Sequence, residues 1–241
     1  MKPLVFLHGW AQSQQIWFQQ HESFPDALYL NLPGHGGADD HQADAWVESI
    51  VQQLPAEPSV LVGWSLGGML ALQIAHTFSD RVAALALVST TPCFRQKTDW
   101  QTGCETSLFE AFEHAVATGS GRLLNRFFSL MLHGDNLNRH DYNHLARLAV
   151  DREHPASASG LDNGLALLGS LDIRSCMADI SVPTLVMHGD QDAIVSVNSG
   201  RWLAKSIANS RMHLFEKCGH APFLTQTNLF NKNLFNWWKT L

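Results

Sequence analysis

Residues 59–69, SVLVGWSLGGM, constrain the fold of this chain more than any other stretch. Residues 60–62 form a short apolar run typical of a buried strand, and apolar residues recur at helical spacing from 66 to 78. Ser65 therefore lies in the turn between a strand and a helix. Gly63 and Gly67 flank it, because a turn this sharp leaves no room for a Cβ atom at those positions. The pattern predicts a nucleophile elbow, although a flexible Gly/Ser loop would match the same five residues.

Strands and helices alternate along the first 92 residues. The run 4–7 is apolar throughout, which is typical of a parallel strand covered on both faces. Strands that alternate with helices predict an α/β fold with a mostly parallel, doubly wound sheet. Strands are expected over 4–7, 27–30, 60–62 and 82–88, and helices over 13–20, 46–54 and 66–78.

The pattern changes between residues 93 and 176, where helical periodicity continues without intervening strands. Strand–helix alternation then returns. We therefore expect a core made of residues 1–92 and 177–241 and an inserted helical cap over 93–176. The helices expected in the cap cover 105–118, 121–132, 139–150 and 161–171; after it we expect strands over 183–188 and 212–215 and helices over 196–207 and 229–238.

The composition excludes several classes of protein. The 241 residues carry 16 Lys and Arg against 22 Asp and Glu, so the chain lacks the overall basic character of nucleic-acid-binding proteins. The four cysteines form no C-x-x-C pair, which gives no sign of a zinc site or a disulfide framework. The apolar run 4–7 is too short for a signal sequence or a membrane span. We expect a cytoplasmic protein that binds neither nucleic acid nor membrane.

The position of one histidine matches the requirements of a serine nucleophile. A serine hydroxyl needs an imidazole to accept its proton and a carboxylate to fix the imidazole tautomer. In the elbow architecture these residues follow in the order serine, acid, histidine. Only His213 and His220 follow the last acidic cluster at a strand end, and His213 falls inside a predicted strand. His220 lies in the loop beyond that strand and is the candidate base.

The acid is expected in the loop after the strand 183–188, where the sequence reads HGDQDAIV. Two aspartates compete there. Asp190 follows a glycine directly and could hold the turn by accepting backbone amides. Asp192 lies further along, where the loop can reach back toward His220. We favour Asp192 and keep Asp190 as the alternative.

Two backbone amides are candidates for the oxyanion hole. The N–H of Leu66 follows the nucleophile at a helix N-terminus, and the N–H of Trp10 follows His8-Gly9 at the end of the first strand. Catalytic groups in α/β sheets gather at such carboxyl ends. The Trp10 side chain is expected to line the acyl pocket while its amide faces the oxyanion.

Five sequence blocks, spread over nearly the whole chain, resemble those of the α/β-hydrolase superfamily: HGW at 8–10, PGHG at 33–36, GWSLGG at 63–68, DQD at 190–192 and GHAPF at 219–223. More narrowly, GWSLGG, TTPCF at 90–94 and segments late in the cap resemble the pimeloyl-acyl-carrier-protein methyl ester esterases of biotin synthesis. The resemblance implies a carboxylesterase that releases methanol from the ω-methyl ester of a carrier-bound pimeloyl chain. It implies Ser65, Asp192 and His220 as the triad, with no metal or organic cofactor.

By the same resemblance, residues 121–131 correspond to the family's substrate-binding segment. Arg122 and Arg126 are four residues apart and would share one helical face, from which they would contact an acidic carrier protein. Arg139, on the next helix, would add a third positive group. They could instead be solvated and pair with the acidic residues of the cap. Where the family has a further arginine, this chain has Asn143. The residues expected to contact substrate are Trp10, Ser65, Leu66, Phe127, Phe128, Ser129, Leu130, Met131 and His220.

Two rival interpretations stay open. The same fold serves short-chain esterases, thioesterases, lactonases and carbon–carbon bond hydrolases, and a non-catalytic ligand receptor could retain the pocket. Serine at the elbow excludes the aspartate nucleophile of haloalkane dehalogenases and epoxide hydrolases. Related enzymes also have a hairpin ahead of the first strand, so we expect one sheet edge here to be short or differently covered.

Overall fold

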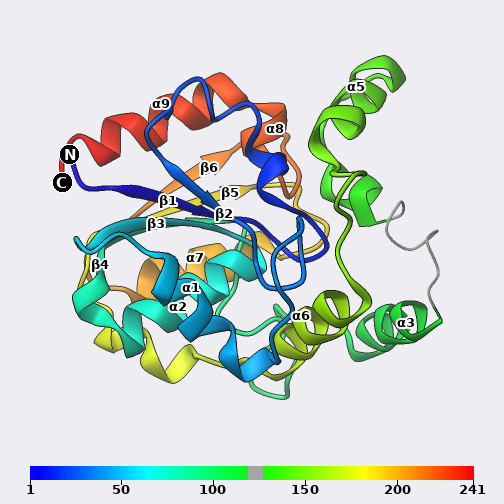
Figure 1. The fold of residues 1–241 in the computed structure, drawn as a ribbon, viewed down its shortest axis with the longest axis horizontal. Helices are drawn as coiled ribbons and strands as arrows, with labels where there is room; N and C mark the ends of the chain where they lie inside the picture. Colours follow the sequence, from blue (N-terminus) through cyan, green and yellow to red (C-terminus); the bar gives the residue numbers. More distant parts are fainter. Residues whose placement is uncertain (119–126) are drawn as a thin grey trace.

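A parallel sheet forms the centre of the molecule, whose computed structural model describes residues 1–118 and 127–241 (Figure 1). In the described residues it has six strands in the order β2-β1-β3-β4-β5-β6, and every neighbouring pair is parallel. This topology confirms the predicted α/β fold. The strands are β1 (Leu4–Leu7), β2 (Leu28–Leu30), β3 (Ser59–Trp64), β4 (Val82–Val88), β5 (Thr184–Gly189) and β6 (Ser210–Phe215).

Helices cover both faces of the sheet (Figure 1). One face carries the short 3-10 helix η1 (Gln14–Trp17) together with α8 (Pro222–Thr225) and α9 (Thr227–Trp238). The other face carries the helices that connect the central strands. These are α1 (Trp46–Gln53), α2 (Leu66–Thr77) and α7 (Val197–Ser206), with the short 3-10 helices η2 (Ala43–Ala45), η3 (Ser79–Arg81) and η4 (Arg174–Asp179) in the connections.

Aromatic side chains fill the space between β1, β3 and the α8–α9 face. The Trp17 ring packs against Phe6 and Phe223, with ring centroids 5.1 and 4.2 Å apart. The Trp64 ring packs edge-on against Phe223 at 5.1 Å. Because Trp64 precedes Ser65 and Phe223 follows His220 closely in sequence, this core holds the elbow and the histidine loop on one rigid base.

The helices α3 (Thr106–Ala117), α5 (Arg139–Ala149) and α6 (Ala158–Ser170) lie between β4 and β5 in sequence. Residues 127–131 form a further helical turn. In Figure 1, α3 and α6 lie side by side below the line of the sheet, whereas α5 stands apart above them, near η1. The expected helix over 121–132 begins among residues that lie outside the described part of the chain.

Two short elements differ from the sequence prediction. The helix expected over 13–20 is only the single 3-10 turn η1, because the Ser13 side chain accepts the Gln15 N–H and the Phe18 N–H bonds Gln15 O. The buried Gln20 side chain then donates to Phe223 O at 3.0 Å, so tertiary contacts replace further helical turns. The helix α8, which begins with Pro222 in the first turn, was expected to be loop.

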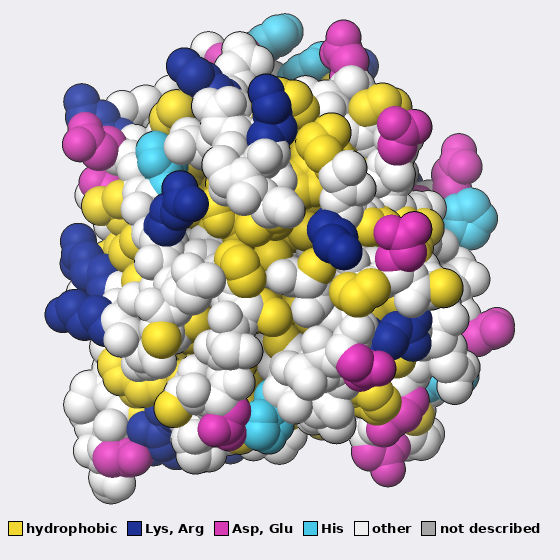
Figure 2. Space-filling view, turned by 90° about the vertical axis from the view of Figure 1, so that its left-hand side faces the viewer, with side chains coloured by type: hydrophobic (Ala, Val, Ile, Leu, Met, Phe, Trp, Pro, Cys, Tyr) yellow, Lys and Arg dark blue, Asp and Glu magenta, His cyan; other side chains and the backbone are white. Residues whose placement is uncertain are grey.

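The end of the molecule where both termini lie shows apolar groups interspersed with charges of both signs (Figure 2). The two termini meet there, and Trp238 Nε1 donates to Lys2 O at 2.9 Å. Among the described residues, no helix is long and apolar enough to cross a membrane.

Candidate active site

Ser65 occupies a strained turn between β3 and α2. Its backbone has φ 54° and ψ −119°, outside the regions that non-glycine residues favour. The turn is tight because a Cβ atom on Gly63 would lie 2.5 Å from Gly67 O, and one on Gly67 would lie 2.5 Å from His8 O. Two hydrogen bonds fix the strained residue: Ser65 N–H donates to Val88 O at 3.0 Å, and Thr90 Oγ1 donates to Ser65 O at 2.6 Å.

The loop after β1 passes directly beside the serine. A Cβ atom built on Gly9 would lie 3.1 Å from Ser65 Cβ, so a larger residue here would crowd the serine side chain. The serine side chain is nearly enclosed, with 7% of the residue exposed. The N–H groups of Trp10 and Leu66 donate no hydrogen bond to any described residue. Both amides are therefore available to an oxyanion formed at Ser65.

His220 is fully buried in the loop between β6 and α8. Its Nδ1 lies 2.8 Å from Asp192 Oδ2. Its backbone is held on both sides, because Trp64 Nε1 donates to His220 O at 2.9 Å and His220 N–H donates to Met131 O at 2.8 Å. The residue next to Ser65 thus ties the histidine loop to the elbow.

The contacts of His220 define its tautomer. An ionised carboxylate only accepts, so Nδ1 carries the proton and Nε2 carries the lone pair. His220 Nε2 is buried and has no hydrogen-bond partner among the described residues. In particular, no hydrogen bond joins it to Ser65 Oγ in this structure. Such bonds are often long before substrate binds, and a partnerless basic nitrogen is what a general base requires.

The two aspartates that compete in the sequence have different partners. Asp190 Oδ1 accepts the Cys218 N–H at 3.3 Å and so holds the start of the histidine loop. Asp192 is fully buried, and its Oδ1 accepts the N–H groups of Ile194 and Val195, both at 2.9 Å. Burial alone raises the pKa of a carboxyl group, but the adjacent imidazoles, of which His220 has the larger effect, keep the pKa of Asp192 well below its ordinary value. Asp192, and not Asp190, is therefore an ionised partner for His220.

Two further buried histidines hold the loop that carries Trp10. His8 Nδ1 donates to Gly9 O at 2.8 Å, and its Nε2 accepts the Leu32 N–H at 2.9 Å. His35 Nε2 accepts the N–H of Ala11, whose φ of 58° is also strained, at 3.2 Å. Burial, aided by the neighbouring His35, lowers the pKa of His8 to about 3, and burial also lowers the pKa of His35. Both rings are therefore neutral at pH 7.

An apolar pocket adjoins the Trp10 side chain. Its cavity volume is about 30 Å³, within about 400 Å³ of empty space that includes open solvent. Trp10 packs edge-on against Phe127 at 5.2 Å, and its Nε1 donates to Leu161 O in α6. The walls hold no charged side chain among the described residues, so the pocket suits an uncharged chain. They are formed by Trp10, Phe94, Cys104, Leu108, Phe112, Phe127, Leu130, Leu165, Leu168, Ala193 and Ile194.

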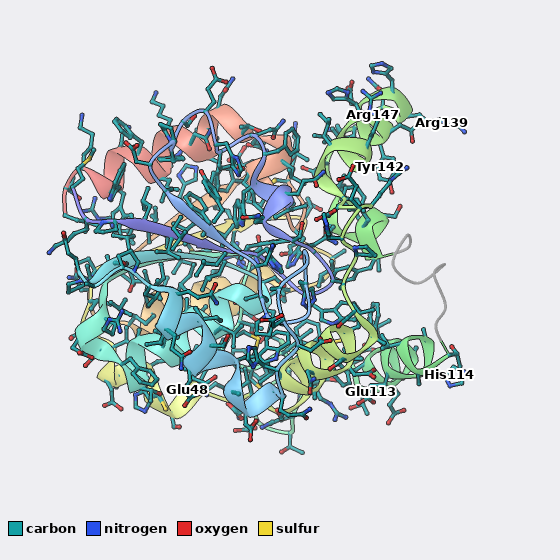
Figure 3. The ribbon with its side chains drawn as sticks, in the orientation of Figure 1. Glu48, Glu113, His114, Arg139, Tyr142 and Arg147 are labelled. Atoms are coloured by element: carbon teal, nitrogen blue, oxygen red, sulfur yellow. The ribbon has the colours of Figure 1, made fainter. Side chains whose placement is uncertain are left out.

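The other cap residues singled out in the sequence lie elsewhere. Phe128 is buried against Tyr142 of α5 at 5.9 Å, and Ser129 is exposed. Met131 is fully buried and contacts the site through its carbonyl, which holds His220. Arg139 is exposed and points outward from α5 (Figure 3). Arg122 and Arg126 lie outside the described residues.

The segment after the 127–131 turn makes a second contact with the histidine loop, in addition to the bond from His220 N–H to Met131 O. Asp135 Oδ2 accepts the Gly219 N–H at 3.0 Å, and Asp135 Oδ1 accepts the Thr225 hydroxyl at 2.6 Å. Burial raises the pKa of Asp135, although these hydrogen bonds oppose the shift. Together with Met131 O, Asp135 binds two consecutive amides of the histidine loop, at Gly219 and His220.

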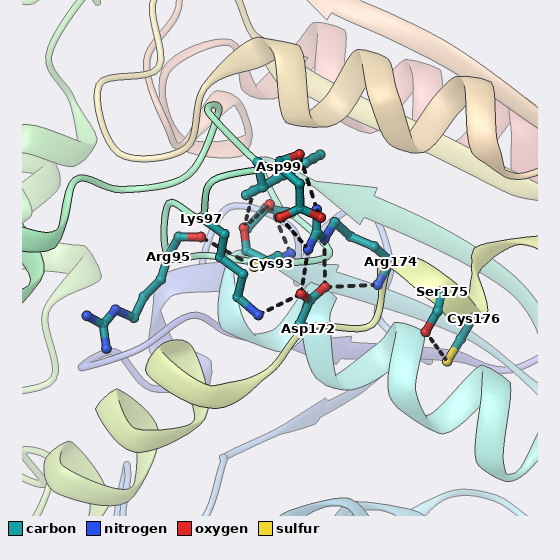
Figure 4. Close-up of polar contacts among 10 residues, drawn as sticks. Cys93, Arg95, Lys97, Asp99, Asp172, Arg174, Ser175 and Cys176 are labelled. Atoms are coloured by element: carbon teal, nitrogen blue, oxygen red, sulfur yellow. Dashed lines mark hydrogen bonds and ion pairs between the residues drawn. The ribbon is translucent and has the colours of Figure 1, made fainter.

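The two chain segments that enter and leave the cap are joined by an ion-pair network (Figure 4). Arg174 donates to Asp172 through Nε and Nη2, at 2.8 and 2.7 Å, and to Asp99 Oδ2 at 3.0 Å. Lys97 Nζ lies 2.7 Å from Asp172 Oδ2. Hydrogen bonds from Arg174 and Lys97 lower the pKa of Asp172. The network joins residues 97–99 to residues 172–174, and we call these two segments the stem of the cap.

Sequence reasoning missed three of these residues. His188 was noted only as the end of a strand, yet its Nε2 lies 3.2 Å from Asp192 Oδ2. His35 was noted only within the PGHG block, and Asp135 only as one of several acidic residues of the cap. The spacing of His188, in β5, and Asp192, four residues later in the loop that follows, was the available signal for the first. Asp135 gave no local signal, because it binds residues 84 and 90 positions away.

Comparisons with known proteins give a consistent result. The model of the family described as alpha/beta hydrolase fold matches residues 2–227. A pimeloyl-[acyl-carrier protein] methyl ester esterase of Nitrosomonas europaea is 36% identical over 92% of this chain and 90% of that protein. One from Aromatoleum aromaticum is 34% identical over 92% of both chains. Among solved structures, an esterase from Exiguobacterium antarcticum superposes with a TM-score of 0.86 at 25% identity, over 99% of this chain and 92% of the other.

Proposed function

Because this chain belongs to the α/β-hydrolase family, we propose that it is a serine carboxylesterase that hydrolyses the methyl ester of pimeloyl-acyl-carrier protein. The observation that carries the esterase chemistry is the state of His220, whose Nδ1 lies 2.8 Å from Asp192 while its buried Nε2 keeps its lone pair. The names of the relatives that are 36% and 34% identical support the choice of substrate. A cytoplasmic location is part of the same proposal.

The proposed reaction proceeds in two halves. His220 Nε2 accepts the proton of Ser65 Oγ as this oxygen attacks the ester carbonyl, and the oxyanion accepts hydrogen bonds from the Trp10 and Leu66 amides. The imidazolium then protonates the departing methoxide, which leaves as methanol. Water hydrolyses the acyl-enzyme by the same steps and releases the free carboxylate. Asp192 stabilises the imidazolium in both halves, and the steps need no metal or cofactor.

The apolar pocket supports an uncharged aliphatic acyl chain as the substrate. Phe127 and Leu130 line it from the cap, and Ala193 and Ile194 line it from the loop that carries Asp192. A methylene chain gains favourable burial there, about 0.8 kcal/mol for each CH₂ group.

Relative rates on three substrates test the proposal: methyl pimeloyl-carrier protein, its free small-molecule methyl ester and a pimeloyl thioester. We expect the carrier-bound methyl ester to have the highest kcat/KM, with methanol and the free acid as products. A higher kcat/KM for the thioester would reassign the enzyme as a thioesterase. Equal values for the carrier-bound and free methyl esters would remove the carrier protein from the proposal. Failure of the protein to react with a fluorophosphonate would favour a receptor, because only an activated serine reacts.

Charge on the cap provides a separate test of carrier binding. The proposed contact includes Arg139, so Arg139→Glu should raise KM for the carrier-bound ester and leave KM for the free ester unchanged. Arg201, exposed on α7 and outside residues 93–176, is the matched control. The carrier's advantage should also shrink as salt shortens the screening length from about 10 Å at 0.1 M to about 3 Å at 1 M. Equal effects of the Arg139 and Arg201 changes would contradict a cap-specific contact.

A further inference from the structure

A second imidazole contacts the carboxylate of Asp192. His188, in β5, is fully buried, and its Nε2 lies 3.2 Å from Asp192 Oδ2 and 3.0 Å from Val195 O. The same Asp192 oxygen lies 2.8 Å from His220 Nδ1. One carboxylate oxygen thus faces two imidazole rings, only one of which has a role in the proposed reaction.

The partners of His188 determine where its proton lies. The Val195 carbonyl only accepts, so His188 Nε2 must carry a hydrogen. His188 Nδ1 is buried and has no partner among the described residues. A second proton at Nδ1 would therefore be a buried donor without an acceptor, which is unfavourable. The hydrogen-bond partners therefore place the His188 proton at Nε2, which bonds Val195 O and lies 3.2 Å from Asp192 Oδ2.

The packing around His188 keeps the ring in this orientation. A Cβ atom on Gly200 of α7 would lie 2.5 Å from His188 Nδ1, so the glycine leaves the space that the ring occupies. On the opposite edge, the ring meets the loop of Asp192 and Val195. Strand β5, helix α7 and the loop that carries Asp192 and Val195 together hold the His188 ring in this orientation.

With His188 included, four N–H groups surround the Asp192 carboxylate. Oδ1 accepts the two amides of Ile194 and Val195, Oδ2 accepts the proton of His220 Nδ1, and His188 Nε2 lies 3.2 Å from Oδ2. A buried carboxylate stays ionised only where donors replace its hydration. Removing one donor leaves a fully buried oxygen partly unsatisfied beside the catalytic histidine.

We propose that His188 is a positioning residue that, by donating from Nε2 to Asp192 Oδ2, holds this carboxylate ionised and oriented toward His220. The inference rests only on the serine-hydrolase part of the proposed function and not on the carrier substrate. It concerns the chemical step, so its loss should lower kcat and leave KM nearly unchanged. Residues that orient ligands or catalytic groups in this way commonly contribute about 10- to 100-fold to activity.

Two substitutions separate the hydrogen bond from the packing. In His188→Gln the amide nitrogen takes the approximate place of Nε2, so the donor is kept. In His188→Asn the amide lies near the position of Nδ1, so the contact with Asp192 is lost. We expect kcat for a 4-nitrophenyl ester to fall about 10- to 100-fold in the Asn variant, with Gln restoring most of the loss. Similar losses in both variants, or no loss in the Asn variant, would overturn the proposal.

A measurement on the unmodified protein covers the case in which the variants do not fold. The ring nitrogens of ¹⁵N-histidine-labelled protein report each tautomer, and side-chain correlations to the backbone assign the signals. We expect Nε2–H for His188 and Nδ1–H for His220. An Nδ1–H tautomer for His188 would contradict the proposal even without a variant. Absence of any esterase activity in the wild type would instead contradict the proposed function, so the two failures are distinguishable.

Discussion

Histidine rings support both sides of the candidate active site, but they bond in opposite senses on the two sides. On the oxyanion side, formed by the loops after β1 and β2, His8 and His35 accept backbone N–H groups through Nε2. On the acid side, formed by the loops after β5 and β6, His220 Nδ1 donates to the carboxylate of Asp192, and His188 Nε2 lies 3.2 Å from the same carboxylate. The Nε2 atoms of the first pair accept backbone amides, whereas both rings of the second pair face a carboxylate.

Because of this difference, we expect substitutions on the two sides to change different properties of the protein. The oxyanion side has no ionised group in contact with its histidines' Nε2 atoms, so its hydrogen bonds mainly contribute to folding and loop geometry. The acid side surrounds the buried carboxylate of Asp192. A substitution that alters the contacts of this carboxylate changes which nitrogen of His220 carries the proton. We therefore expect substitutions on the acid side to lower kcat, and those on the oxyanion side to lower stability and its dependence on pH.

The Ser65→Ala substitution gives the largest expected effect and the baseline for both sides. Removal of the nucleophile should lower kcat by about a million-fold, as in other serine triads. The protein should remain folded, because the small side chain occupies the same strained turn. Circular dichroism and thermal unfolding check the fold, and residual ester hydrolysis well above this level would contradict the proposed nucleophile.

A matched pair of aspartate variants tests the acid side. In Asp192→Asn the Oδ1 position must still accept two amides, so the new NH₂ group faces His220 and favours its Nε2–H tautomer. That tautomer cannot accept the serine proton, and kcat should fall about 10⁴-fold. Asp190→Asn keeps a carbonyl oxygen for the Cys218 N–H and should retain most activity. Comparable losses in the two variants would show that the loop, and not the charge, matters.

We expect the buried histidines of the oxyanion side to make the free energy of unfolding depend on pH. The folded-state pKa of His8 is lowered to about 3 from an ordinary value of 6.5, and the pKa of His35 is also lowered. The unfolded chain therefore binds protons first as the pH falls. The contribution of His8 to the free energy of unfolding is fully present above pH 6.5 and should fall by up to about 1.4 kcal/mol per pH unit as the pH falls from 6.5 toward about 3. His35, whose pKa is also lowered, should add to the slope below pH 6.5.

Urea unfolding of His35→Gln checks this expectation. The Gln oxygen can accept the Ala11 N–H but does not titrate, so the variant should lose part of the slope below pH 6.5. The exposed His140 supplies the control, because His140→Gln makes the same substitution on the surface of the protein. If stability depends on pH in His35→Gln as it does in the wild type, His35 does not contribute to the loss of stability at acidic pH.

The stem of the cap should show the smallest effect, because it touches neither side. Asp172 is paired with both Arg174 and Lys97, whereas the Asp99 side chain is 68% exposed. Asp172→Asn should lower the free energy of unfolding by about 1 kcal/mol, and Asp99→Asn by less. Neither should change kcat on a small ester. A large loss of kcat would mean that the stem positions the site.

The sequence was sufficient for the fold because strand and helix periods are local signals. Val82–Val88 is an unbroken apolar run and appears as β4 with the expected bounds, and the change of period after residue 92 coincides with the segment between β4 and β5. The order of Ser65, Asp192 and His220 was likewise readable, because each follows a strand end. Their common catalytic role stays a proposal, which rests on the contact between His220 and Asp192.

The features that the sequence did not predict depend on contacts between residues that are far apart in the chain. Gln20 halts a predicted helix through a bond to Phe223. Asp135 holds Gly219, and no periodicity links two positions so far apart. His188 could have been connected to Asp192 by its spacing, but only the fold shows that its Nε2 faces the carboxylate. Side-chain bonds between loops are set by tertiary packing, and local patterns do not encode them.

The bonds from Met131 O and Asp135 to the histidine loop limit how this enzyme can be re-engineered. A cap exchanged as a block between relatives would bring a foreign residue to position 135 and a foreign backbone to position 131. The chimera would then alter the support of the base as well as the substrate pocket. Altering the pocket alone requires substitutions at wall positions such as Leu108 and Phe112, with residues 131–135 kept as they are.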